Sequence, residues 1–168
     1  YNGLHGNISK TTNAYAGTGA LRWEYELPAT TDPNQFYTSI RFDLGETKDL
    51  SSYDKLSLRL YRHAGNFPQD LLYLKFYTAN LADPNVKAEA WIDRADCVVE
   101  PSEEWSEWQI ELSDLRGYQG QGTASQEDLT DIRYILIGTG TSNLTGAKLG
   151  TIDIDELTLI KNPTCSGR

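Results

Sequence analysis

Residues 56–61 read LSLRLY and residues 72–77 read LYLKFY, and both segments alternate apolar and polar side chains. Such alternation is typical of a β-strand that buries one face and exposes the other. A third stretch, EAWID at 89–93, also alternates. The outward positions of the three stretches carry aromatic rings beside charged groups: Arg59, Tyr61, Tyr73, Lys75, Tyr77, Glu89, Trp91 and Asp93. We predict that these residues stand together on one solvated sheet face, which binds a ligand.

Short segments of this kind recur along the chain, separated by glycine, proline, asparagine and aspartate. The expected strands are 20–27, 36–44, 55–62, 71–78, 86–99, 108–112, 131–138 and 151–160. Regular short strands without a long helix predict an all-β fold, here a β-sandwich jelly roll of two antiparallel sheets. Trp23 and Trp108 share their alternation with apolar neighbours and are expected in the core. We expect one domain over 1–161 and a C-terminal tail or linker start over 162–168.

Composition narrows the classes of ligand. The 168 residues carry a formal net charge of −9, which argues against nucleic acid and anionic membranes, since both need clustered lysine and arginine. No segment approaches the roughly 20 apolar residues that span a bilayer. A neutral ligand is the simpler expectation. The chain begins at Tyr1 and contains no methionine, so we expect an excised segment of a longer precursor. We also expect a secreted protein and a monomer.

The two cysteines, Cys97 and Cys165, leave two alternatives open. In a secreted protein the pair would form one disulfide and connect the tail to the strand region near residue 98. The other alternative is two separate thiols. Two cysteines without matching histidines are too few for a zinc site.

Five segments, in order along the chain, resemble β-jelly-roll carbohydrate-binding modules of the galactose-binding-like superfamily. The most specific read WSEWQIELSDL at 105–115, DLTDIRYILIG at 128–138 and GTIDIDELTL at 150–159. Residues 17–23 and 49–58 are similar to two earlier segments of these modules. The resemblance implies a glycan-binding domain without catalytic activity, appended to a secreted enzyme that degrades plant polysaccharides. Cellulose, xyloglucan and mixed-linkage glucan are the ligands that it favours.

The aromatic and charged outward residues suit a sugar chain. A pyranose ring has an apolar C–H face that packs on an aromatic plane, and its hydroxyls bond charged or amide groups at the sides. Trp91, Tyr61, Tyr73 and Tyr77 are therefore the expected ring contacts. Tyr37 and Arg41 would join this face if their strand is its neighbour. The alternative is that these aromatics only fill gaps between strands.

The resemblance also implies a structural calcium ion. It would be held by Asp155 in the closing strand, with Asp153 at the same alternation, and by groups from the N-terminal region. Gly17 would allow close backbone approach, and Asn7 or Asn13 would supply a side-chain oxygen. The alternative is that both aspartates are solvated edge carboxylates.

Nothing in the sequence points to catalysis. The two histidines, His5 and His63, belong to no metalloprotease motif, and no nucleophile elbow or phosphate-binding glycine loop is present. Carboxylates are plentiful, so a polysaccharide lyase or glycoside hydrolase on a jelly-roll scaffold stays an alternative. A purely structural or adhesion domain is a further alternative.

Overall fold

The computed structural model describes residues 6–27, 37–64, 71–77, 86–91, 103–117, 129–140 and 148–161. Their strands are β1 (Gly6–Thr11), β2 (Ala20–Leu27), β3 (Tyr37–Lys48), β4 (Lys55–Arg62), β5 (Leu71–Tyr77), β6 (Val86–Trp91), β7 (Trp105–Glu111), β8 (Arg116–Gly117), β9 (Ile132–Gly140) and β10 (Lys148–Ile160). A single-turn 3-10 helix, Leu112–Asp114, follows β7. No helix in these ranges is long and apolar enough to cross a membrane.

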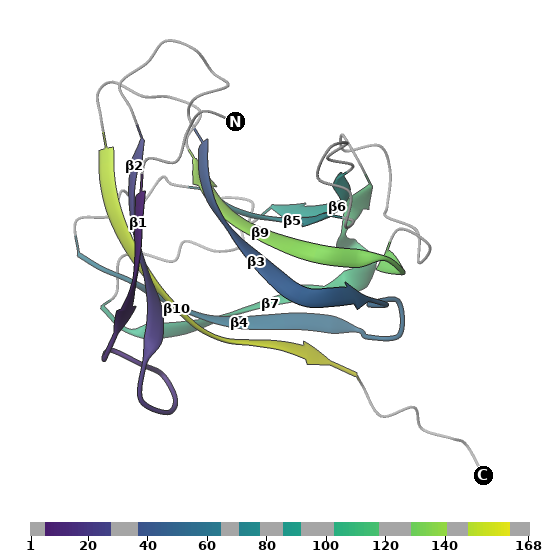
Figure 1. Ribbon diagram of the computed structural model, residues 1–168, viewed down its shortest axis with the longest axis horizontal. Helices are drawn as coiled ribbons and strands as arrows, with labels where there is room; N and C mark the ends of the chain where they lie inside the picture. The colour runs from purple at the N-terminus through teal and green to yellow at the C-terminus, as the bar shows by residue number, and fades with distance from the viewer. Residues whose placement is uncertain are drawn as a thin grey trace.

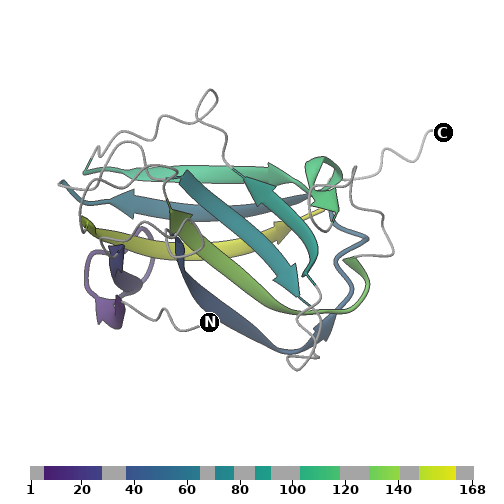
Figure 2. The ribbon, with the colours of Figure 1, turned by 90° about the horizontal axis from the view of Figure 1, so that it is seen from above.

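The strands form two five-stranded antiparallel sheets packed face to face (Figure 1), which confirms the predicted all-β sandwich. Sheet A has the order β1-β2-β10-β4-β7, and sheet B has the order β3-β9-β5-β6-β8. Figure 2 shows the strands of sheet B lying across those of sheet A. Consecutive strands β4 and β5 belong to different sheets, so the chain crosses the sandwich between them.

Both sheets curve in the same sense, so the outer face of sheet B is the concave side of the sandwich and that of sheet A the convex side (Figure 1). β10 follows this curve over its whole length. Its register with β4 shifts between Asp155 and Thr158, and Glu156 has a left-handed φ of 47°. One extra residue at such a bulge bends the strand and increases its twist.

The core lies between the inner faces of the two sheets. Sheet A supplies Trp23, Trp108 and the leucines of β4, and sheet B supplies Leu72, Leu74 and Phe76 of β5 and the isoleucines of β9. The alternation in 56–61 and 72–77 is thus explained, because each strand turns every second side chain into the core. The expectation that Trp23 and Trp108 are core residues is confirmed.

Two described strands were not predicted, and two begin earlier than expected, one of them β10 at Lys148 and not at residue 151. β1, with the sequence GNISKT, is exposed except at Thr11, so it carries no apolar alternation that would reveal it. β8 has only two residues. β7 begins at Trp105 and not at residue 108. Its first inward position is Ser106, which interrupts the apolar pattern.

Leu58→Ala should lower the free energy of unfolding by about 2–5 kcal/mol, because it removes packed methyl groups and leaves a cavity. Leu58 is fully buried on β4, which lies between β10 and β7 in sheet A. Denaturant unfolding measures the effect, with Leu149→Ala as a control of the same chemistry at a site that is 68% exposed. Equal losses for the two variants would contradict the described packing.

Candidate functional site

The predicted ligand-binding residues divide between the two sheets. The register of sheet B pairs Tyr73 with Trp91 and Lys75 with Glu89, so these four residues share its outer face. Arg59 and Tyr61, in contrast, lie on β4 in sheet A. The prediction of one shared face is therefore wrong for Arg59 and Tyr61. Alternation shows which side of a strand faces solvent, but it does not show to which sheet the strand belongs.

Residues of β3 join the outer face of sheet B. Arg41 pairs with Leu136 of β9, and Leu136 pairs with Lys75, so Arg41, Lys75 and Glu89 share one row across the sheet. Tyr37 opens β3 opposite Gly140. β3 is therefore not the direct neighbour of β5, because β9 lies between them, but it contributes to the same face of sheet B. Asp93 lies outside the described residues.

Tyr73 is held within this face and is only 6% exposed. Its ring lies over Gly138, where an added Cβ would come within 2.0 Å of Tyr73 Cζ. Its hydroxyl donates a long hydrogen bond of 3.5 Å to the carbonyl of Thr38. For Tyr73, the described packing agrees with the gap-filling alternative. Lys75 and Tyr77 are half-buried, and the Lys75 ammonium lies 5.4 Å from the centre of the Tyr73 ring.

Tyr134 is a member of this face that the sequence did not single out. It pairs with Asp43 on one side and with Tyr77 on the other. The guanidinium of Arg41 lies 4.8 Å from its ring centre and that of Arg133 lies 5.7 Å away. The sequence did contain a signal for Tyr134, since it alternates with the core isoleucines Ile135 and Ile137 of β9. Leu136 shares the outward parity of Tyr134 but is apolar, so the sequence of this strand looked buried on both faces.

Arg133 and Asp43 form an ion pair beside Tyr134, with 2.6 Å between Nε and Oδ1. The hydrogen bond from Arg133, followed by that from the Gly45 amide, lowers the pKa of Asp43 below its ordinary value. The pair therefore stays ionised at neutral pH. Arg41 remains as an exposed cation in the central row of the sheet.

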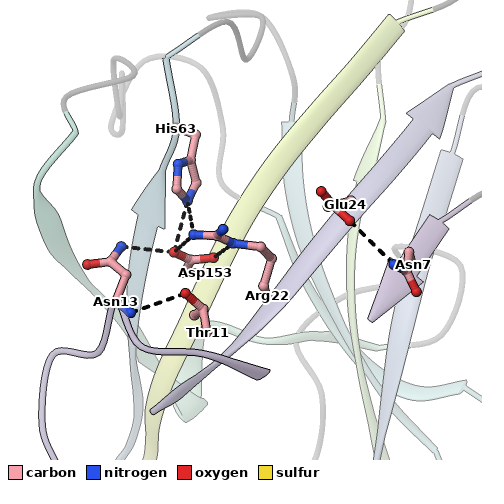
Figure 3. Close-up of polar contacts among 7 residues, drawn as sticks. All are labelled: Asn7, Thr11, Asn13, Arg22, Glu24, His63 and Asp153. Atoms are coloured by element: carbon pink, nitrogen blue, oxygen red, sulfur yellow. Dashed lines mark hydrogen bonds and ion pairs between the residues drawn. The ribbon is translucent and has the colours of Figure 1, made fainter. Parts of the chain in front are cut away.

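Asp153, one of the predicted calcium ligands, is fully buried within a cluster of protein donors on sheet A (Figure 3). Arg22 binds it in bidentate fashion, with Nε 2.8 Å from Oδ1 and Nη2 2.9 Å from Oδ2. The side-chain amide of Asn13 donates to Oδ2 at 2.9 Å. Nε2 of His63 lies 2.8 Å from the same oxygen. Asp153 is thus neither a solvated edge carboxylate nor an open metal ligand.

Asp155, the other predicted ligand, accepts backbone hydrogen bonds. Its Oδ2 receives the N–H groups of Tyr15 and Ala16 at 3.0 and 3.1 Å, and its Oδ1 receives that of Glu156 at 2.9 Å. The carboxylate therefore connects the β1–β2 loop to the bulge in β10. Gly17 lies in the same loop with a φ of 71°, a conformation that favours glycine.

These residues do not fit a calcium ion. Calcium takes six to eight oxygen ligands, whereas the oxygens of Asp153 and Asp155 already accept hydrogen bonds from protein donors, and a guanidinium stands beside Asp153. Asn7 lies apart from the cluster, where it donates to Glu24 at 3.4 Å (Figure 3). The described ranges contain no group of three or more His, Cys, Asp or Glu placed to hold a metal. The calcium prediction thus rests on the resemblance alone.

Comparison with solved structures places this fold among known proteins. A family 11 carbohydrate-binding module from Clostridium thermocellum, solved with a β-1,3-1,4-mixed-linked tetrasaccharide, aligns with 96% of this chain and 86% of its own at a TM-score of 0.62 and 16% identity. The family 30 module of the cellulosomal cellulase Cel9D-Cel44B of the same organism aligns with 98% of this chain and 86% of its own, at a TM-score of 0.64 and 14% identity. This chain has the fold of the β-sandwich carbohydrate-binding modules.

Not every match is an isolated module. An exo-β-agarase aligns with 95% of this chain but only 23% of its own length, at 14% identity and a TM-score of 0.57. No family model matches the chain, and no curated protein matches it. The likeness to binding modules therefore lies in the three-dimensional fold.

Asp153→Asn should lower the free energy of unfolding by about 1–3 kcal/mol at neutral pH, since it removes the buried carboxylate that accepts the hydrogen bonds of Arg22 and Asn13. Burial alone would raise the pKa of Asp153, but hydrogen bonds from Arg22, Asn13 and His63 outweigh burial and lower it below its ordinary value. The ionised carboxylate therefore stabilises the fold fully above the ordinary pKa of an aspartate, and this contribution is lost as the pH falls through the lower folded-state pKa.

Urea unfolding of both proteins between pH 7 and pH 3 measures this effect. The wild-type protein should lose its advantage over Asp153→Asn at the acidic end. Glu46→Gln, which removes a carboxylate from an exposed ion pair with Lys48, serves as the control and should change little. A constant difference across the whole pH range would show that the charge of Asp153 is not what stabilises the cluster.

Chelation gives a separate test of the metal prediction. Because Arg22, Asn13 and His63 already surround Asp153, the melting temperature should be the same in calcium and in EDTA. Differential scanning calorimetry of the same sample in both buffers provides the measurement. A melting temperature that falls on chelation would reveal a calcium site formed by other ligands.

Proposed function

We propose that this chain is a non-catalytic module that binds a neutral β-glucan-type polysaccharide on the outer face of sheet B. Cellulose, xyloglucan and mixed-linkage glucan are the candidate ligands. The observation that carries the proposal is the register of this sheet, which sets the Tyr73–Trp91 pair beside the Arg41–Lys75–Glu89 row. The matched modules support the same class of ligand, since one was solved with a mixed-linked tetrasaccharide.

The chemistry of the face suits an uncharged sugar chain. Aromatic rings offer apolar surface for the C–H face of a pyranose, and cations and carboxylates in the next row offer donors and acceptors for its hydroxyls. Tyr73 supports the face from a buried position, while Lys75, Tyr77 and Arg41 are at least partly accessible. The outer face of sheet B is the concave side of the sandwich (Figure 1).

In this proposal, binding serves an attached enzyme. A secreted glycoside hydrolase linked to the module would work at a raised effective concentration of its polysaccharide substrate, without any chemistry in the module itself. The net charge of −9 favours an uncharged polysaccharide over an anionic one. One of the matched modules belongs to a cellulosomal cellulase, which supports this arrangement.

Trp91→Ala should weaken binding by more than about 1 kcal/mol if Trp91 is a central ring contact, and Lys75→Ala should weaken it by a smaller amount. Affinity electrophoresis in gels containing mixed-linkage glucan, xyloglucan or hydroxyethyl cellulose compares the variants. Leu149→Ala, on the opposite sheet, is the matched control and should migrate like the wild-type protein.

Two results would contradict the proposal. Unchanged migration of Trp91→Ala and Lys75→Ala in a gel that retards the wild-type protein would remove sheet B from the binding site. New reducing ends or unsaturated products, released from the same polysaccharides by the isolated chain, would make it an enzyme.

A further inference from the structure

Four rings form a continuous row on the outer face of sheet A, opposite the face considered above. Tyr15 from the β1–β2 loop lies 6.2 Å from Trp105 of β7, centroid to centroid. Trp105 lies 5.7 Å from Tyr61 of β4, and Tyr61 lies 4.8 Å from His63. We name Tyr15, Trp105, Tyr61 and His63 the sheet A aromatic row. It contains Tyr61, whose place on this sheet separates it from the predicted ligand contacts on sheet B.

The register explains why these rings face outward. Tyr61 pairs with Trp105 on one side and with Asp153 on the other, and the alternate positions of β4 are the core leucines. The rings meet edge to face at 60° to 65° and do not stack flat. None of them belongs to the apolar core between the sheets. Tyr61, Trp105 and His63 are half-buried, and Tyr15 is 46% exposed.

The chain holds Tyr15 in this exposed position through several contacts. Asp155 accepts the backbone N–H groups of Tyr15 and Ala16, and the neighbouring Asn13 donates to Asp153. The guanidinium of Arg59 lies 4.4 Å from the centre of the Tyr15 ring. Here, fixed contacts present an aromatic ring to solvent.

Paired charges border the row. Arg59 and Glu107 form an ion pair at 3.2 Å, and Glu107 also accepts hydrogen bonds from Ser57 at 2.6 Å and Gln109 at 2.9 Å. At the other end of the row, Arg22 and His63 contact the buried Asp153. Because each of these carboxylates has a cationic partner, the surface suits a ligand without net charge. Apolar rings beside fixed donors and acceptors match the two kinds of surface on a neutral sugar.

We infer that the sheet A aromatic row is a second polysaccharide-binding surface of this chain. The ligand class rests on the proposed function, whereas the surface itself rests on separate residues. A module with ligand surfaces on both outer faces can bind two polysaccharide chains at once and cross-link them. Such a module would hold neighbouring polysaccharide chains together as well as bind them.

Substitutions on the two faces separate the surfaces. Trp91→Ala with Lys75→Ala disables the proposed site on sheet B, and this double variant should still be retarded in the polysaccharide gels. Adding Tyr15→Ala should weaken its remaining binding at least about fivefold, whereas Tyr15→Phe in its place should retain it, since the ring is kept. Leu149→Ala is an exposed control on the same sheet, outside the row.

Cross-linking gives a second readout with the single Tyr15→Ala variant. The wild-type protein should raise the viscosity of dilute mixed-linkage glucan at sub-stoichiometric ratios, and Tyr15→Ala should not, although sheet B still retards it in gels. Asp155→Asn removes a charged acceptor of the loop amides and should have the same effect if Tyr15 must be held in place. Melting temperatures of all variants confirm that they are folded.

The outcomes distinguish the two claims. If the double variant on sheet B loses all retardation while the wild-type protein is retarded, the second surface is overturned and the proposed function stands. If the double variant binds like the wild-type protein and Tyr15→Ala abolishes binding, sheet A is the main site and the proposed site on sheet B is wrong. If the wild-type protein is retarded by no polysaccharide, both claims are overturned.

Discussion

Apolar contact between the inner faces of the two sheets is the interaction on which the remaining structure depends. Because Leu56, Leu58 and Leu60 must enter the core, their neighbours in β4 are forced outward. The same applies to β5, where Leu72, Leu74 and Phe76 are buried. Two outer faces with rings and charges are thus a direct consequence of one core. The crossing of the chain between β4 and β5 places these faces on opposite sides of the molecule.

The cluster around Asp153 shows how this chain connects its N-terminal loop to the last strand. A structural calcium ion would neutralise carboxylates and bring distant segments together. Here Arg22 supplies the positive charge from the neighbouring strand, and the bidentate geometry of the guanidinium matches the carboxylate. Asn13 then joins the loop to the same carboxylate. Asp153 and Asp155, the two aspartates named for calcium, therefore connect this loop to β10 through hydrogen bonds.

This chain shares its fold with the matched binding modules, although its sequence is only 14–17% identical to theirs. At this distance the shared feature is the arrangement of two sheets around an apolar core, and function resides in the side chains of the outer faces. The two faces of this chain differ in character. Sheet B presents a concave face whose rings Tyr73 and Tyr134 are packed into the sheet, and sheet A presents a convex face whose row includes the exposed Tyr15.

The sequence by itself determined the fold class, most strands and which face of each strand is buried. These properties follow from alternation, which is a local pattern with a period of two residues. It also identified aromatic and charged outward residues such as Tyr61 and Lys75. Only the tertiary structure decided which strands share a sheet, and therefore that Tyr61 meets Trp105 and Tyr15 and is separated from Tyr73. It also decided that Asp153 faces Arg22, because strand pairing is a long-range choice that local pattern does not encode.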